Sequence, residues 1–181
     1  MKLNAILLIV LSSLVCSGQT YRPADADAPS KITIASREEP GERLIVSGTV
    51  YGPDGVTPLK GASIYVYHTD IKGHYSEGTT RSDNPRLRGW LRSDAKGRYE
   101  FNTIKPGPYP ASRVPAHIHY VVSAPGHREK IFEIVFEGDS FINDQVRSDA
   151  KKEDGVFSIR QLEKDGQGML RCVQDIRLRR Q

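Results

Sequence analysis

The stretch Leu170-Arg-Cys-Val-Gln-Asp-Ile-Arg-Leu178 has the most regular pattern in the 181-residue chain. Successive side chains of a β-strand point to opposite faces, so every second residue lies on the same side. One face would carry Leu170, Cys172, Ile176 and Leu178, and the other Arg171, Val173, Asp175 and Arg177. The alternation therefore predicts a strand with one buried face. Cys172 is accordingly predicted to be a buried small hydrophobic residue rather than a reactive thiol.

Short runs of the same kind recur along the rest of the chain, with turn residues between them. Residues 51–55, Tyr-Gly-Pro-Asp-Gly, and residues 94–97, Asp-Ala-Lys-Gly, are such turns. The strand-like runs cover residues 43–50, 62–68, 90–93, 98–103, 117–122, 130–136, 156–160 and 170–178. Only residues 143–151 have a helical pattern. We therefore expect one all-β domain, an antiparallel β-sandwich of about eight strands with little helix.

The first residues have the order of a secretory signal peptide. Lys2 precedes an apolar run at residues 5–11, and small residues follow around Cys16 and Gly18. The run is too short for a spanning helix. We expect a signal peptide at residues 1–18, cleavage after Gly18, and an exported protein, periplasmic or secreted, with no transmembrane span in the mature chain. A lipoprotein with a lipid anchor at Cys16 is the alternative.

After this cleavage, residues 19–41 would form an extended polar arm and residues 42–181 the sandwich domain. Cys172 would remain as the single ordinary thiol, which excludes an internal disulfide. The chain has 26 Lys and Arg against 22 Asp and Glu, and loss of Lys2 leaves 25 − 22 = +3. This small excess argues against nucleic-acid binding. The sequence leaves the assembly state open, a homo-oligomer included.

Chemistry is expected where residues 106–119 combine a proline-braced tyrosine with a His-x-His pair. His117 and His119 would lie on the same face of one strand, so both can reach one point. Tyr109 stands between two prolines, which restrict its backbone and aim its ring. A second tyrosine, Tyr75, follows Gly73 and opens a polar loop at residues 76–88.

The remaining tyrosines and histidines have weaker signals. A tyrosine in a β-rich protein is usually a packing residue with a satisfied hydroxyl, and this applies to Tyr51, Tyr65, Tyr67, Tyr99 and Tyr120. The other histidines lack a same-face partner and are expected at the surface or around the site: His68, His74 and His127.

Two imidazoles and two phenols suit few metals. Imidazole binds several transition metals, whereas phenolate prefers a hard, highly charged cation. Tyrosine ionises near pH 10 in water, and a trivalent ion can drive that ionisation at neutral pH. Iron(III), two phenolates and one hydroxide sum to zero charge. A dianionic catecholate could replace the hydroxide and one phenolate without changing the net charge of the site. Tyr109, which lies on its own loop, is the ligand expected to leave.

Three motifs carry a resemblance to a known family. They are residues 92–110, Arg-Ser-Asp-Ala-Lys-Gly-Arg-Tyr-Glu-Phe-Asn-Thr-Ile-Lys-Pro-Gly-Pro-Tyr-Pro, residues 115–119, Pro-Ala-His-Ile-His, and residues 136–139, Phe-Glu-Gly-Asp. Together they resemble the intradiol ring-cleavage dioxygenases, which include catechol 1,2-dioxygenase and protocatechuate 3,4-dioxygenase. The similarity covers roughly residues 45–140. The chain resembles the smaller exported members, because residues 19–41 leave no room for a helical dimerisation segment.

The resemblance implies a non-haem iron(III) cofactor bound by Tyr75, Tyr109, His117 and His119. It implies that a catechol-type substrate displaces Tyr109 and hydroxide and reacts with O2. Acyl migration then gives a cyclic anhydride, and hydrolysis yields a cis,cis-muconate-type diacid. A nearby cation would stabilise negative charge on the ring, and Arg113 is the candidate.

The chain departs from the family pattern at two positions. The family arginine stands directly before Pro-Ala-His, but here Val114 intervenes and Arg113 is one residue further away. The family also tends to have a glutamine where this chain has Glu133. A carboxylate there would alter the field that the substrate experiences.

Two alternatives to an enzyme remain open at the level of sequence. Residues 48–55 and 58–64 resemble the opening of transthyretin-like and carboxypeptidase-regulatory-like domains, which would make the chain a non-catalytic sandwich module. A protein that binds iron or a catecholate without turnover is the second alternative. The four ligands distinguish an enzyme from the non-catalytic module, which would lack them. Only a measurement of turnover distinguishes an enzyme from the iron- or catecholate-binding protein.

Overall fold

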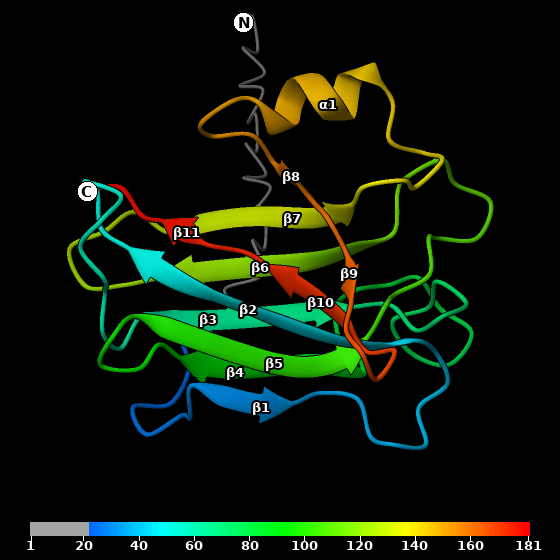
Figure 1. The fold of residues 1–181 in the computed structure, drawn as a ribbon, viewed down its shortest axis with the longest axis horizontal. Coiled ribbons are helices and arrows are strands. Elements are labelled where there is room, and N and C mark those ends of the chain that lie inside the picture. The colour runs from blue at the N-terminus through cyan, green and yellow to red at the C-terminus, as the bar shows by residue number, and fades with distance from the viewer. Residues whose placement is uncertain (1–21) are drawn as a thin grey trace, which may run out of the picture.

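The computed structural model describes residues 22–181, which form two β-sheets in face-to-face layers (Figure 1). The first sheet contains, in spatial order, β1 (Lys31–Thr33), β5 (Arg98–Ile104), β2 (Arg43–Tyr51), β10 (Leu170–Val173) and β9 (Glu163–Lys164), and β11 (Ile176–Arg177) also pairs with β2. The second contains β4 (Leu87–Arg92), β3 (Ser63–His68), β6 (His117–Ser123), β7 (Lys130–Phe136) and β8 (Phe157–Arg160).

The helix predicted at residues 143–151 is confirmed as α1 (Asp144–Ala150), which lies between β7 and β8. Asn143 begins it, because the Asn143 side chain accepts a hydrogen bond from the Val146 N–H and so satisfies one free donor of the first turn. Among residues 22–181, no helix is long and apolar enough to cross a membrane.

The two layers agree with the predicted sandwich, but the expectation of purely antiparallel sheets was wrong. β1 pairs with β5 in parallel, β10 and β11 pair with β2 in parallel, and β8 pairs with β7 in parallel. Parallel neighbours need a long crossover connection, whereas a short turn makes an antiparallel hairpin. The β7–β8 connection contains α1, and the other three pairs join segments distant in sequence. The sheets are therefore mixed.

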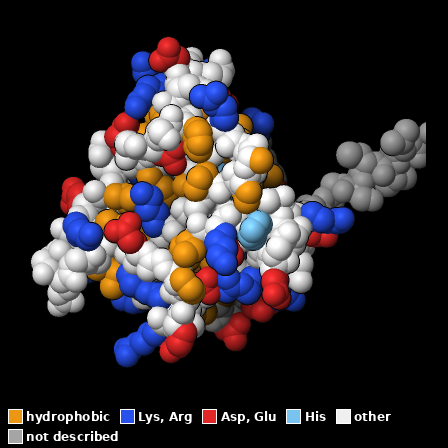
Figure 2. Space-filling view, turned by 90° about the vertical axis from the view of Figure 1, so that its right-hand side faces the viewer, with side chains coloured by type: hydrophobic (Ala, Val, Ile, Leu, Met, Phe, Trp, Pro, Cys, Tyr) orange, Lys and Arg blue, Asp and Glu red, His pale blue; other side chains and the backbone are white. Residues whose placement is uncertain are grey.

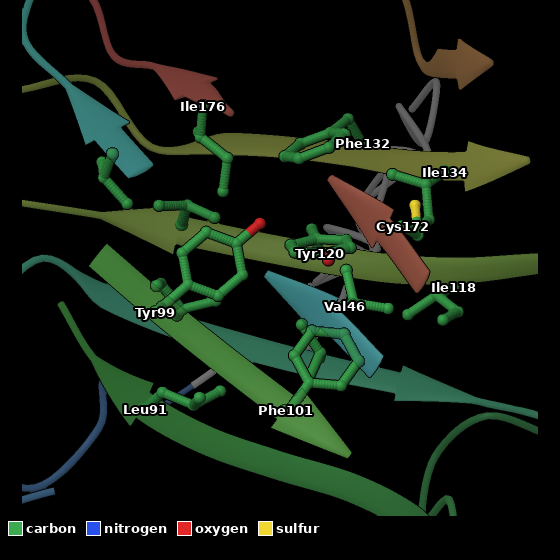
Figure 3. Packing of buried hydrophobic residues seen from close by; sticks show 14 of the residues in the cluster. Val46, Leu91, Tyr99, Phe101, Ile118, Tyr120, Phe132, Ile134, Cys172 and Ile176 are labelled. Atoms are coloured by element: carbon green, nitrogen blue, oxygen red, sulfur yellow. The ribbon is translucent and has the colours of Figure 1, made fainter. Parts of the chain in front are cut away.

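The core lies between the layers and follows the alternation seen in the sequence (Figure 3). In the stretch 170–178, Leu170, Cys172, Ile176 and Leu178 are buried, as predicted. Aromatic rings fill the centre: Tyr120 stacks on Phe132 with ring centroids 4.8 Å apart and is 6.1 Å from Phe101. This rigid double layer holds the loops at its ends in place.

Only part of the N-terminal segment for which the sequence makes predictions lies within the described residues. The predicted signal peptide at residues 1–18 and the Cys16 anchor lie outside the described residues. Within the expected arm, residues 31–33 form β1, which adds a strand beside β5. Ala24 also donates its N–H to Ser63 Oγ at 2.8 Å, so this part of the arm is attached to both sheets.

The elements that carry the predicted ligands meet at one end of the sandwich, on the right of Figure 1. β3 runs antiparallel to β6 with His68 opposite Ile118, so the end of β3 adjoins the start of β6. β5 ends at the same side (Figure 1). Viewed onto this end, basic, acidic and hydrophobic side chains are interspersed over the surface (Figure 2). Tyr75 follows β3, Tyr109 follows β5, and the two histidines begin β6.

Candidate metal centre

The two tyrosine-bearing loops are held against each other by backbone contacts. Gly107 donates its N–H to the Asp70 carbonyl at 2.9 Å and accepts from Thr69 Oγ1 at 2.7 Å. These bonds join the loop after β3 to the loop after β5 a few residues before their tyrosines. The approach of Tyr75 to Tyr109 is therefore set by contacts between the two loops.

Gly73 allows this close approach. Its φ is +79°, a conformation that residues with a Cβ rarely adopt. A Cβ there would lie 2.0 Å from the Pro108 carbonyl oxygen, far inside van der Waals contact. Glycine is thus needed at this position both for the turn and for the contact between the loops.

The histidines are presented by the first residues of β6, and their surroundings orient the rings. Asp139 Oδ2 accepts the Ala116 N–H at 2.9 Å and so anchors the chain just before the strand. His117 Nδ1 donates to the Pro115 carbonyl at 2.7 Å. The His119 ring stacks on Tyr67, with centroids 4.3 Å apart and planes 9° apart.

Four side-chain atoms then converge: the hydroxyl oxygens of Tyr75 and Tyr109 and the Nε2 atoms of His117 and His119, here called the Tyr–His quartet. Tyr75 Oη contacts Tyr109 Oη and lies 2.6 Å from His119 Nε2. Tyr109 Oη lies 3.0 Å from His117 Nε2 and 3.4 Å from His119 Nε2. The two Nε2 atoms are 3.0 Å apart. The quartet is as compact as a set of ligands around one ion.

The positions of the imidazole protons leave both Nε2 atoms of the quartet able to bind a metal ion. A carbonyl oxygen and a carboxylate only accept, so the proton on each imidazole lies at Nδ1, toward Pro115 O in His117 and toward Glu133 in His119. An imidazole whose one proton lies at Nδ1 has a lone pair at Nε2. The two Nε2 atoms are 3.0 Å apart, and a phenol O–H can donate to each: Tyr75 to His119 and Tyr109 to His117. Imidazole nitrogen and phenol oxygen are both metal ligands, so the donor set fits a metal.

The electrostatics of the quartet fit the same conclusion. Burial lowers the pKa of His117, which keeps it as the neutral imidazole that binds metals. Burial, together with the neighbouring Tyr109 hydroxyl, raises the pKa of Tyr75 far above its usual value. Burial also raises the pKa of Tyr109. The protein alone holds both phenols neutral, and only a strong positive charge would ionise them.

The sequence did not predict the contact between Glu133 and His119. Glu133 Oε1 lies 3.1 Å from His119 Nδ1. Burial opposes ionisation of Glu133, but the hydrogen bond with His119 and the electrostatic attraction of His119 and His117 together outweigh it, so the pKa of the carboxyl lies below its usual value. A hairpin that turns at Gly126 would have predicted the pairing, since Glu133 and His119 are each seven residues from that turn (133 − 126 and 126 − 119).

His117, His119 and Glu133 also offer ligand atoms within 4.8 Å of one another. Glu133 meets the Nδ1 edge of His119, however, and the tyrosines meet the Nε2 edge. One ion cannot bind at both edges of the ring. A metal would therefore bind at the Nε2 edge, where the quartet lies, and the carboxylate would be a partner of the ligand and not a ligand, a position where carboxylates commonly lie around metal sites.

Two further residues named from the sequence, Arg113 and His68, lie outside the quartet. Arg113 is an exposed residue of the loop before β6, and the structure does not bring it into the quartet. His68 was expected at the surface or around the site, but it is fully buried, with Nε2 2.6 Å from Thr103 Oγ1. Burial lowers its pKa to about 4, so it is a neutral core residue that links β3 to β5.

Comparison with known proteins agrees with the geometry of the site. The model of a family described as Dioxygenase (Dioxygenase_C) matches residues 17–180. The chain belongs to the intradiol dioxygenase family. It is 33% identical over 141 residues to catechol 1,2-dioxygenase 2 of Acinetobacter lwoffii, covering 69% of this chain and 50% of that protein. It is 32% identical over 148 residues to chlorocatechol 1,2-dioxygenase of Rhodococcus opacus, covering 72% of this chain and 57% of that protein.

Solved structures of intradiol dioxygenases share the fold. Catechol 1,2-dioxygenase from Acinetobacter sp. ADP1, inhibited by bound mercury, superposes with a TM-score of 0.66 at 27% identity and covers 86% of this chain and 59% of that chain. The dioxygenase domain of a carbohydrate-binding fusion protein from Streptomyces sp. SirexAA-E has a TM-score of 0.64 at 23% identity and covers 91% and 97%. The chain thus spans about half the length of the curated relatives it matches.

Proposed function

We propose that the protein is a non-haem iron(III)-dependent intradiol dioxygenase that cleaves a catechol-type ring with O2 to a cis,cis-muconate-type diacid. The observation that carries this proposal is the convergence of two phenol oxygens and two lone-pair Nε2 atoms at one point. Phenolate selects a hard, highly charged cation, and imidazole is a ligand that iron accepts. The names of the relatives supply the substrate class, because they are catechol, chlorocatechol and hydroxyquinol 1,2-dioxygenases.

The exposure of the two tyrosines supports a division of roles between them. Tyr75 is 2% exposed and packs against Tyr67, which favours a permanent ligand. Tyr109 is only partly buried and lies on a loop between β5 and β6, so it can move aside for a substrate. Because burial raises the pKa of its phenol, Tyr109 as a phenolate would be basic enough to accept a proton from an incoming catechol hydroxyl.

The other residues hold the site in one arrangement. Pro115 and Glu133 keep the Nε2 lone pairs of His117 and His119 directed at the quartet, and Tyr67 limits rotation of the His119 ring by stacking on it. When bound, iron(III) supplies a Lewis acid and a template that ionises and orients the catechol. Arg113, an exposed residue of the loop before β6, is the proposed cation near the ring.

Purified protein loaded with iron(III) tests the proposal. Phenolate-to-iron charge transfer should colour it red to purple. With a panel of catechols it should consume O2, and a muconate-type diacid containing label from 18O2 should be found by mass spectrometry. His119→Ala should abolish the colour and O2 uptake. The control His127→Ala, whose exposed ring bonds through Nδ1 to the Pro125 carbonyl at the β6–β7 turn, should retain both.

The two alternatives predict different results. A coloured protein that consumes no O2 with any catechol would identify an iron- or catecholate-binding protein without turnover. A colourless protein that binds no iron would favour the non-catalytic module. Oxygen uptake across catechol, protocatechuate, hydroxyquinol and larger plant-derived catechols would also identify the substrate.

We further propose that the protein is exported, on the evidence of Lys2 and the apolar run at residues 5–11. Mass spectrometry of the protein expressed in a bacterial host is the test. A mature chain that begins at Gln19 supports signal-peptide cleavage, and an acylated chain that begins at Cys16 supports the lipoprotein. An intact cytoplasmic chain would contradict both.

A further inference from the structure

Glu133 is a charged residue that contacts a proposed metal ligand without being a member of the quartet. It lies on β7 directly opposite His119 on β6, and its Oε1 is 3.1 Å from His119 Nδ1. The side chains of His119 and Glu133 are 15% and 19% exposed, so water competes little for this contact. Tyr67 covers one face of the same imidazole ring. His119 is therefore held by a carboxylate at its edge and an aromatic ring on its face.

The contact determines which nitrogen of His119 is free. The Glu133 carboxylate accepts a hydrogen bond from Nδ1–H. It disfavours the Nε2–H tautomer, which would place the Nδ1 lone pair beside its negative charge. Nε2, which lies 2.6 Å from Tyr75 Oη, then has the lone pair. A carboxylate at the far nitrogen also makes an imidazole a stronger donor to a metal.

We propose that Glu133 is a positioning residue that fixes the Nδ1–H tautomer of His119 and, through its negative charge, strengthens the bond between His119 and the metal. The metal is taken as iron(III), so this part of the inference rests on the proposed function. The glutamine that the family tends to have at this position could accept the same hydrogen bond but supplies no charge. Tighter binding of iron(III) and a preference for iron(III) over iron(II) would therefore be properties of this chain.

Two substitutions separate the hydrogen bond from the charge. Glu133→Gln keeps an acceptor at nearly the same position and removes the negative charge. Glu133→Leu removes both. Glu129→Gln, at an exposed carboxylate just before β7, is the control because it removes the same charge away from the quartet.

Three measurements follow on each protein. Nitrogen-15 NMR of the histidine side chains in metal-free protein reports the His119 tautomer and needs neither iron nor turnover. Transfer of bound iron(III) to a competing chelator reports the strength of the site. Spectroelectrochemistry of the loaded protein reports the iron(III)/iron(II) midpoint potential. Oxygen uptake with catechol is recorded in parallel as the test of the proposed function alone.

The wild type and Glu129→Gln should show His119 as the Nδ1–H tautomer, and Glu133→Leu should show a mixture of tautomers. Glu133→Gln should keep the tautomer but bind iron about 10–100-fold more weakly, the usual effect of losing such a partner, and its midpoint potential should rise. Unchanged chelator transfer and potential in Glu133→Gln would overturn the role of the charge, and an unchanged tautomer in Glu133→Leu would overturn the positioning role.

The outcomes keep the two proposals apart. If Glu133→Leu does not fold, the tautomer of the wild type and the iron affinity of Glu133→Gln decide: a wild type with the proton on Nε2 contradicts the inference. If iron loss and tautomer change as expected but no catechol supports O2 uptake, the proposed function fails and the inference about Glu133 stands. If the wild type binds no iron(III), the metal part of the inference fails with the proposed function, and the NMR result decides the positioning part.

Discussion

At the scale of single residues, the site depends on which atoms carry protons. The Nε2 atoms of His117 and His119 lie 3.0 Å apart. Each carries a lone pair, because Nδ1–H donates a hydrogen bond to Pro115 O in His117 and to Glu133 in His119. Tyr75 and Tyr109 bring two phenols whose pKa values are raised by burial. In the protein alone the two phenol O–H groups can donate to the Nε2 atoms, and a metal ion bound by all four atoms would take the place of those protons. The residue types and their environment therefore indicate a metal more strongly than any one distance.

Tyr75→Phe tests the assignment of the buried phenol as a permanent ligand. The substitution would remove one proposed anionic ligand and leave the ring, so the fold should be retained and the charge-transfer band should weaken and shift. Loss of one of the two phenolates should reduce turnover by at least roughly 100-fold, the effect of disturbing a positioned catalytic group. Visible absorption and O2 uptake measure both. Tyr51→Phe, on the strand β2 of the other sheet, is the matched control and should change neither. An unaltered band in Tyr75→Phe would remove Tyr75 from the ligand set.

At the scale of elements, the site is a product of two loops and the start of one strand. The end of β3, the end of β5 and the start of β6 lie at the same end of the sandwich (Figure 1). The loops dock through Gly107, whose N–H and carbonyl bond to Asp70 and Thr69. Gly73 has no side chain to keep Pro108 away. A short backbone contact thus controls the distance between the two phenols.

Gly73→Ala should separate the loops without unfolding the sandwich. The new Cβ would lie 2.0 Å from the Pro108 carbonyl oxygen, and the φ of +79° is unfavourable for alanine. The phenols should move apart, with a fall in turnover of about 100-fold for a shift near 1 Å and a weaker charge-transfer band.

Gly78→Ala is the matched control, because Gly78 has a φ of +69° in the same loop but its new Cβ would meet no atom within 4 Å. It bears the backbone strain of roughly 1–2 kcal/mol without the clash. Circular dichroism melting curves and the visible spectrum compare the two variants. Equal effects of both on the spectrum would show that strain, and not loop contact, governs the site.

At the scale of the whole molecule, the double layer supplies stability that no disulfide provides among the described residues. Cys172 is a free cysteine and is 2% exposed, in the face of β10 that packs against the aromatic core. Burial raises the pKa of its thiol to about 11. The thiolate, which is the reactive form, is therefore disfavoured in the folded protein at neutral pH.

Thiol labelling should consequently report global unfolding. In a Cys16→Ser variant, Cys172 is the only thiol, and it should react with an aromatic disulfide reagent only as fast as the protein unfolds. Burial raises the pKa of the Cys172 thiol from 9.0 to about 11, so its contribution to the stability of the folded state is fully present below pH 9 and is lost as the pH rises from 9 through about 11. Native protein should therefore resist labelling up to about pH 9. Labelling rates with and without denaturant measure this. Rapid labelling of native protein at pH 7 would contradict burial of Cys172.

Much of the fold could be predicted from local patterns, because burial of one face of a strand imposes alternation on the sequence. Leu170, Cys172, Ile176 and Leu178 are buried as their spacing predicted, and Asn143 begins the one helix that was expected. Strand direction could not be predicted in this way: β10 lies parallel to β2, and residues 31–33 add β1 beside β5. These pairings join distant segments, and local alternation is the same in parallel and antiparallel strands.

The sequence by itself determined the chemistry of the site: a His-x-His strand, a proline-braced Tyr109, and motifs that place the chain among the intradiol dioxygenases. Only the tertiary structure decided how those groups relate in space. In the structure Glu133 lies at the Nδ1 edge of His119, and Tyr67 stacks on the ring of His119. Arg113 is exposed, and His68 is buried. The reason is physical, since side-chain type is a local property, whereas contacts across strands depend on register and on which loops the two sheets bring together.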